Sequence, residues 1–91
     1  MLIPAQTRAS PTIAEMAALG EDPNSLSALI RFTAPLDMSG HPTITLPGGF
    51  GARETPLAFQ LVGRYFSEDL LIRAGRAYQT ITDWHSRKPR L

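Results

Sequence analysis

Two neighbouring stretches decide the fold: residues 57–63, LAFQLVG, and residues 67–84, SEDLLIRAGRAYQTITDW. In the first stretch Leu57, Phe59 and Leu61 alternate with their neighbours, which is the two-residue period of a β-strand. In the second stretch apolar residues recur at intervals of three and four, which is the period of an amphipathic helix. We expect this helix to pack over the sheet through a stripe formed by Leu71, Ala74, Tyr78, Ile81 and Trp84.

The ends of this helix are marked by residues that favour helix termini. Ser67 is a suitable N-cap, and Glu68 and Asp69 place negative charge at the positive end of the helix dipole. His85 is expected in the last turn, where a partial positive charge is favourable, and Pro89 follows the predicted end.

A second strand is predicted at residues 43–46, TITL, where β-branched residues alternate with apolar ones. Pro47, Gly48 and Gly49 are expected to end this strand in a turn, and residues 47–56 to form a loop. Because no helix is predicted between the two strands, we expect them to pair antiparallel.

Proline and glycine divide the first forty residues into short pieces. Leu2–Pro4 could add a short third strand. Residues 11–17 could form a helix with Ser10 as N-cap, and a second helix could start at Ser25 or Ser27 and end before Pro35. Residues 37–42 are predicted to be a loop. The expected fold is therefore α/β or small α+β, with a short mixed or antiparallel sheet covered by helices, in one partial domain spanning residues 1–91.

Composition excludes several classes of function. The chain has 91 residues, 43% of them hydrophobic, and a net charge of +1, so neither disorder nor strong attraction to nucleic acid or a membrane surface is expected. The short basic cluster of Arg87, Lys88 and Arg90 is typical of a solvated tail. With no cysteine, no signal peptide and no long apolar run, the chain is expected to be soluble and cytoplasmic.

Several residues suggest a catalytic or binding site, but a structural role explains each of them more simply. Asp37, Ser39 and His41 alternate, but a catalytic triad needs histidine between serine and aspartate. In an extended chain Asp37 and His41 would lie roughly 13 Å apart, so we expect Asp37 and Ser39 to bond nearby backbone groups instead. No metal site is expected from the two histidines, and no phosphate loop from the glycines at 48–51. Gln60 is expected on a half-exposed strand rather than at a substrate.

An ordered series of segments resembles the C-terminal part of the amidase-signature family. Residues 32–42, FTAPLDMSGHP, are similar to the family's threonine, proline, asparagine and glycine-x-proline pattern. Residues 43–50 resemble the strand and glycine turn that follow it. Residues 56–64, PLAFQLVGR, resemble the next strand, and residues 66–71 the start of the final helix. Asp37 replaces a usual asparagine, and His41 replaces a residue that is usually apolar.

The resemblance implies a hydrolase of amide bonds whose two catalytic serines and lysine belong to a region that this chain lacks. The chain itself carries one lysine, Lys88. We therefore expect no catalytic residue, metal or cofactor within residues 1–91, and no activity from the chain alone. By the same resemblance, Thr33, Leu36 and Asp37 line the substrate pocket.

Three functions stay open. The chain could be an inactive segment of an amidase, or it could complete the pocket of a separate catalytic chain as a subunit of a split enzyme. It could also be a non-catalytic binding module. Because the small sheet leaves its edges unpaired, we expect homo-oligomers through an exposed edge.

Overall fold

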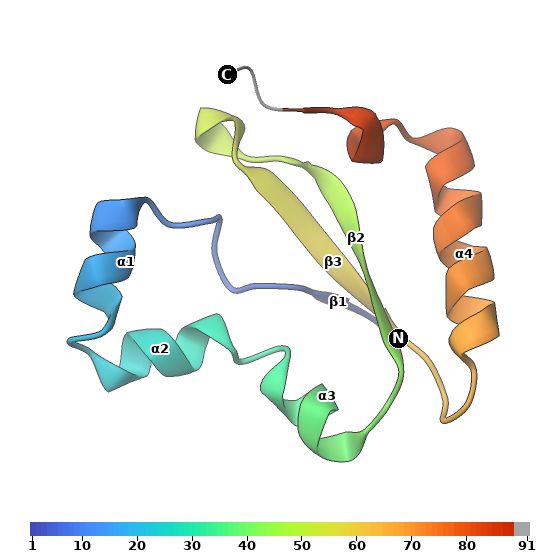
Figure 1. The fold of residues 1–91 in the computed structure, drawn as a ribbon, viewed down its shortest axis with the longest axis horizontal. Helices are drawn as coiled ribbons and strands as arrows, with labels where there is room; N and C mark the ends of the chain where they lie inside the picture. Colours follow the sequence, from blue (N-terminus) through green and yellow to red (C-terminus); the bar gives the residue numbers. More distant parts are fainter. Residues whose placement is uncertain (89–91) are drawn as a thin grey trace.

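The computed structural model, which describes residues 1–88, is a three-stranded antiparallel sheet flanked by helices (Figure 1). The chain runs through β1 (Leu2–Pro4), α1 (Ile13–Leu19), α2 (Pro23–Leu29), α3 (Ala34–Ser39), β2 (Thr43–Phe50), β3 (Pro56–Val62) and α4 (Glu68–Ile81). Two short 3-10 helices, η1 (Ala52–Glu54) and η2 (Trp84–Ser86), follow β2 and α4. The small α+β class predicted from the sequence is confirmed.

The sheet has the order β1-β3-β2, so β3 lies between the two other strands. Both predicted long strands and the short third strand are present, and both pairings are antiparallel. Ile44 and Leu46 of β2 face Leu61 and Phe59 of β3, which places these four side chains on one face of the sheet.

β2 is longer than the sequence predicted. Pairing continues past Pro47 to Phe50, with a register shift between Pro47 and Gly49, so the two glycines form a bulge inside the strand rather than a turn after it. Gly49 takes a φ of 132°, and a Cβ on Gly48 would lie 3.0 Å from the Phe59 ring. The connection between the strands is therefore residues 51–55, shorter than the loop we expected.

α4 packs against β2 because Gly75 allows the close approach. A Cβ at this position would lie 2.9 Å from Cδ1 of Ile44 and 3.4 Å from Cδ2 of Leu46. Leu71 is buried one turn before Gly75, and Tyr78 donates a hydrogen bond of 3.1 Å to the Pro47 carbonyl. The Tyr78 ring also meets the Phe59 ring edge to face, with centroids 5.2 Å apart.

The predicted end of this helix was wrong. α4 stops at Ile81, whose side chain is 81% exposed, and the chain continues extended through Thr82. Trp84 and His85 lie in η2 instead. Ser67 is at the N-cap position, but its hydroxyl donates to the Arg64 carbonyl rather than capping the helix. Pro89 and Arg90 lie outside the described residues.

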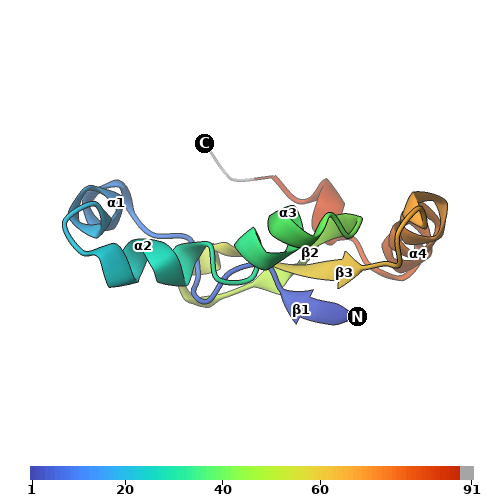
Figure 2. The ribbon, with the colours of Figure 1, turned by 90° about the horizontal axis from the view of Figure 1, so that it is seen from below.

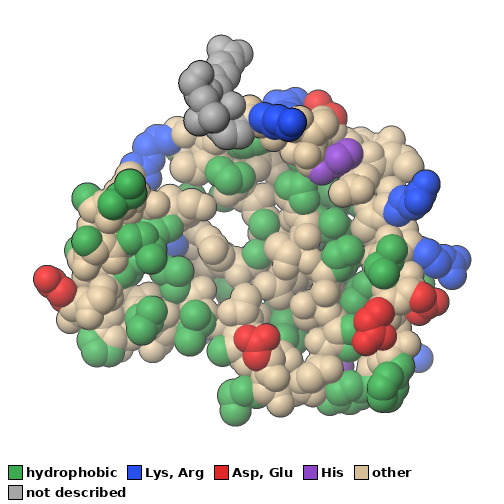
Figure 3. All heavy atoms as spheres, viewed as in Figure 1, with side chains coloured by type: hydrophobic (Ala, Val, Ile, Leu, Met, Phe, Trp, Pro, Cys, Tyr) green, Lys and Arg blue, Asp and Glu red, His purple; other side chains and the backbone are tan. Residues whose placement is uncertain are grey.

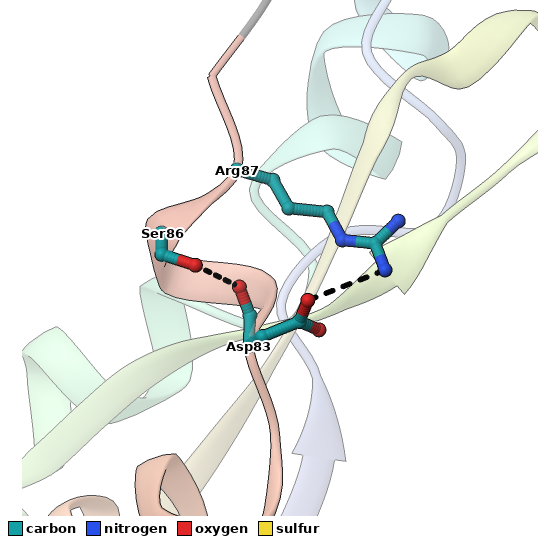
Figure 4. Close-up of polar contacts among 3 residues, drawn as sticks. All are labelled: Asp83, Ser86 and Arg87. Carbon is teal, nitrogen blue, oxygen red and sulfur yellow. Dashed lines mark hydrogen bonds and ion pairs between the residues drawn. The ribbon is translucent and has the colours of Figure 1, made fainter.

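η2 is fastened to the end of β2. Arg87 forms an ion pair with Asp83 at 3.4 Å, and Ser86 donates a hydrogen bond of 2.7 Å to the Asp83 carbonyl (Figure 4). The Arg87 guanidinium also lies over the Trp84 ring, 4.7 Å from its centroid, and Trp84 meets Phe50 edge to face. Aromatic contacts with β2 therefore hold the segment that follows α4.

The helices α1, α2 and α3 form an arm, residues 13–39, that curves away from the sheet (Figure 1). Viewed from the side, the molecule is a thin layer with α1 at one end and α4 at the other (Figure 2). Its extents are 39 × 35 × 16 Å. Even with all side chains drawn, openings remain between the arm and the sheet (Figure 3).

The first two helices begin at caps other than those predicted. Thr12, not Ser10, caps α1 in a reciprocal capping box with Glu15, whose carboxylate accepts a hydrogen bond of 2.6 Å from the Thr12 amide. Asp22, rather than Ser25 or Ser27, caps α2. Within residues 1–88, none of the helices has the length and hydropathy required to cross a bilayer.

Very little of the chain is buried. Among the described residues the buried apolar side chains are Ala5, Leu19, Leu46 and Leu71. The accessible surface is 7043 Å², about 1,800 Å² more than a compact monomer of 10.0 kDa exposes. The radius of gyration is 14.8 Å, against about 12 Å for a compact domain of this length. The fold therefore leaves much apolar surface uncovered.

Two neighbouring leucines on α4, one buried and one exposed, test which side chains form the core. Leu71 is 7% exposed and Leu70 is 57% exposed. We expect Leu71→Ala to lower the free energy of unfolding by about 2–3 kcal/mol, because it opens a cavity against β2. The matched variant Leu70→Ala should change it by less than about 0.5 kcal/mol. Urea titrations followed by circular dichroism compare them, and equal losses would contradict this description of the core.

The carboxylates at the two helix starts should make α1 and α2 sensitive to acid. A backbone hydrogen bond from Thr12 lowers the pKa of Glu15, and hydrogen bonds from the Ser25 hydroxyl and the Asn24 amide lower the pKa of Asp22. A lowered folded-state pKa stabilises the helices above the ordinary carboxyl range, and this stabilisation is lost as pH falls through the lowered pKa.

We therefore expect the amide signals of α1 and α2 in NMR spectra to shift toward unfolded positions between about pH 5 and pH 2. The control is the double variant Glu15→Gln and Asp22→Asn, which keeps acceptor oxygens but removes both titrations. If the variant and the natural chain respond alike to acid, the caps do not control these helices.

Candidate functional site

The three predicted pocket residues lie together on α3. Thr33 occupies its N-cap position, and Leu36 and Asp37 follow at spacings of three and four residues, which places all three on one side of the helix. Thr33 and Leu36 are half-buried, whereas Asp37 is exposed. Their contact with a substrate stays a prediction.

The expectation of a loop was wrong for residues 37–39, because α3 continues through Ser39, whereas residues 40–42 form the expected connection. Pro35 lies in the first turn, where the missing amide hydrogen costs nothing and the fixed φ favours a helix. The proline that we expected to limit the second helix instead lies at the start of α3, and α2 already ends at Leu29. Thr33 does not cap α3 through its side chain, since its hydroxyl donates to the Ile30 carbonyl at 3.2 Å.

Gly40 ends α3 in the left-handed conformation, with φ 70° and ψ 14°. Its amide donates a hydrogen bond of 2.9 Å to the Leu36 carbonyl, and the Ser39 hydroxyl donates to the same oxygen at 3.3 Å. This pattern is a common helix C-cap, and glycine adopts it without the steric cost that a Cβ brings. The turn directs the chain from α3 into β2.

Ser39 and His41 approach each other after this turn. The His41 Nδ1 and Ser39 Oγ atoms are 3.0 Å apart. The extended geometry behind our separation estimate was therefore wrong, although Ser39 does bond a nearby carbonyl as expected. Ser39 is exposed, and a serine–histidine pair needs an enclosed site with oxyanion donors to act as a hydrolase. The contact alone does not define an active site.

Tyr65 joins this cluster from the connection between β3 and α4. Its hydroxyl donates a hydrogen bond of 2.7 Å to the Ser39 carbonyl. Its ring stacks on His41, with centroids 4.2 Å apart and planes 27° from parallel. Sequence periodicity missed Tyr65, because it belongs to neither the strand pattern nor the helix pattern.

Gln60 was also misjudged from the sequence. It lies in the central strand between Ile3 and Thr45 and is 4% exposed. The strand as a whole is partly exposed, as expected, but the Gln60 side chain itself is buried. A polar residue inside an apolar run was the available signal of a special position.

Two open grooves lie elsewhere in the molecule. One, of about 460 Å³, lies between β2 and α4 and is lined by Ile44, Leu46, Ile72, Gly75, Arg76, Gln79 and Thr80. The other, of about 410 Å³, surrounds the end of α4 at residues 80–84. Neither groove is lined by Thr33, Leu36 or Asp37.

The described residues also bring no three histidine or acidic side chains together as a metal site. The site on α3 is thus a surface that can contact another molecule. It carries hydroxyl, aliphatic and carboxylate groups but no assembled catalytic set.

Together, the antiparallel sheet, the glycine bulge and the final helix define a small α+β segment. Residues 1–72 match the model of the amidase family, so the chain belongs to the amidase family. The expected family is confirmed.

The relatives are much longer than this chain. It is 48% identical over 89 residues to the "Putative amidase AmiD" of Mycobacterium tuberculosis, which covers 98% of the chain and 19% of that protein. It is 42% identical over 83 residues to a glutamyl-tRNA(Gln) amidotransferase subunit of Roseiflexus sp., covering 90% of the chain and 17% of that protein. The chain thus spans about a fifth of the length of these relatives. No solved structure matches it.

Two glycines that end helices test the geometry at α3. Gly40 has a φ of 70°, whereas Gly20 ends α1 with a φ of −68°, and a Cβ there would make only an ordinary contact of 3.9 Å with the Ala17 carbonyl oxygen. Gly40→Ala should therefore lower the free energy of unfolding by about 1–2 kcal/mol, because alanine is strained in the left-handed region. Gly20→Ala should be neutral or slightly stabilising. Urea denaturation of both variants is the measurement, and a harmless Gly40→Ala would contradict the C-cap assignment.

Proposed function

We propose that the chain supplies one wall of an amide-hydrolysing site whose nucleophile and base lie outside residues 1–91, and that the chain alone is inactive. The observation that carries this proposal is the match of nearly the whole chain to one fifth of an amidase. A serine that attacks an amide bond must be activated by a neighbouring base. The family uses a lysine in that role, and the single lysine here is Lys88, two residues after η2.

The uncovered surface supports a role as part of a larger assembly. A standard protein interface buries about 800 Å² on each partner, and this chain exposes about 1,800 Å² more than a compact monomer. Apolar side chains are exposed at both ends of the layer, on the arm and on α4, and Figure 3 shows several of them gathered over α1 and α2. The proposed partner of this surface is the catalytic part of an amidase-signature enzyme.

In this assembly α3 presents Thr33, Leu36 and Asp37 to the substrate. Leu36 offers an apolar contact and the Thr33 hydroxyl a polar one. Asp37 brings a negative charge, which would disfavour an anionic substrate group nearby. This wall would fix the orientation of the amide, and a catalytic chain would supply the chemical step.

The same surface supports a second candidate, a non-catalytic module that self-associates. β1 and β2 are both edge strands, and an unpaired edge can accept a strand from a second copy. Sedimentation over a range of concentrations distinguishes the two. A stable homodimer that does not bind an added catalytic partner favours the module. A homodimer that dissociates and forms a complex with the catalytic partner favours the pocket wall.

A chimaera tests the proposed function. The M. tuberculosis relative would be expressed without its matched segment, and with the matched 89 residues of this chain in its place. We expect the truncated enzyme to lose hydrolysis of simple aryl amides and the chimaera to regain it, because the chain restores the missing wall. Replacement of the relative's nucleophilic serine by alanine is the control that must abolish the regained activity.

The isolated chain provides the opposite test. We expect no aryl amide turnover and no labelling by a fluorophosphonate probe. Labelling of the isolated chain that disappears in Ser39→Ala would assign catalysis to the Ser39–His41 pair and overturn the proposal.

A further inference from the structure

The end of α3 is joined to the sheet by three side chains, Ser39, His41 and Tyr65, which we call the Tyr65 clamp. Tyr65 makes two different contacts: its hydroxyl donates to the Ser39 carbonyl at 2.7 Å, and its ring stacks on His41 at 4.2 Å between centroids. His41 in turn meets Ser39 Oγ at 3.0 Å. The clamp therefore connects two segments that lie 26 residues apart in the sequence.

The backbone on both sides is shaped to bring Tyr65 to this position. The Gly63 amide donates a hydrogen bond of 2.9 Å to the Pro42 carbonyl, so the end of β3 is tied to the residue before β2. Phe66 follows with a φ of 60°, a conformation that is unfavourable for a bulky side chain. The Phe66 side chain is 94% exposed, so its own packing does not explain this strain. The turn at Phe66 follows directly on Tyr65, whose side chain lies at the surface, 56% exposed, against Ser39 and His41.

α3 needs an external support of this kind. It has six residues, none of them buried, and the side chain of its N-cap residue accepts no hydrogen bond from the amides of the helix. Helices this short are unstable in isolation, because nucleation costs more than a few hydrogen bonds return. Contacts at the ends of α3 must therefore fix its position.

We infer that Tyr65 is a positioning residue, which holds α3 in a fixed place relative to the sheet by binding Ser39 and His41. Given the proposed function, it thereby places Thr33, Leu36 and Asp37 in the pocket wall. The unusual histidine at position 41 has a role in this account, because its flat ring supplies the surface on which Tyr65 stacks. Tyr65 acts through α3 and does not touch the substrate.

Hydrogen exchange in the 91-residue chain tests the clamp directly. Tyr65→Phe removes only the hydroxyl, and Tyr65→Leu removes the aromatic ring as well. We expect exchange of the Asp37 and Gly40 amides to speed up about fivefold in Tyr65→Phe, the effect of losing one hydrogen bond. It should speed up further in Tyr65→Leu, while amides of β2 and β3 change little. The control is Phe66→Leu, which removes an exposed ring from the same turn.

The chimaera then links the clamp to substrate binding. We expect Tyr65→Leu to raise KM several-fold with kcat nearly unchanged, the result of weaker binding without a loss of chemistry. Unchanged exchange in both Tyr65 variants, or equal acceleration in Phe66→Leu, would overturn the clamp. Faster exchange with unchanged KM would sustain the clamp and count instead against α3 as the pocket wall. An inactive parent chimaera would count against the proposed function alone, since exchange is measured without it.

Discussion

The structure depends on the close contact between α4 and β2 at Gly75. Leu46 lies at this contact and Leu71 lies one turn before Gly75 on α4, and they are two of the four buried apolar residues among those described. A side chain at position 75 would meet Ile44 and Leu46, so the helix approaches the strand only because glycine is there. Most of the remaining apolar residues have no such partner. The arm of α1, α2 and α3 extends beyond the sheet with Leu19 as its one buried position. A small core at one end and exposed helices at the other are what we expect of a piece that completes a larger protein.

The sequence predicted those parts of the structure that depend on local interactions. The period of residues 57–63 and 67–81 indicated the central strand and the main helix, and the antiparallel pairing followed from the absence of a crossover helix. The predictions failed where a residue type occurs in two different local structures. Pro35 was taken as the end of a helix, but it begins α3. Gly48 and Gly49 were taken as a turn, but β3 keeps pairing past them, and they form a bulge. Ile81 fits the helical stripe, but nothing covers it.

The candidate site shows the same limit of local patterns. Family resemblance pointed to Thr33, Leu36 and Asp37, and the structure places them on one side of α3. The resemblance gave no indication of Tyr65, because the hydrogen bond from Tyr65 to Ser39 joins residues that lie 26 positions apart in the sequence. The likeness to amidases and the thin core lead to the same proposal. The proposed wall, held at its end by Tyr65, would assist catalysis only when another part of an enzyme adjoins it.

Residues 1–88 form an open layer with a small core, and we propose that another protein surface covers it. Small-angle X-ray scattering from the purified chain, at concentrations where sedimentation shows a monomer, measures this most directly. The account predicts a radius of gyration of about 15 Å or more, in line with the 14.8 Å of the structure. A monomer with the radius of about 12 Å expected for a compact domain of 91 residues would contradict it.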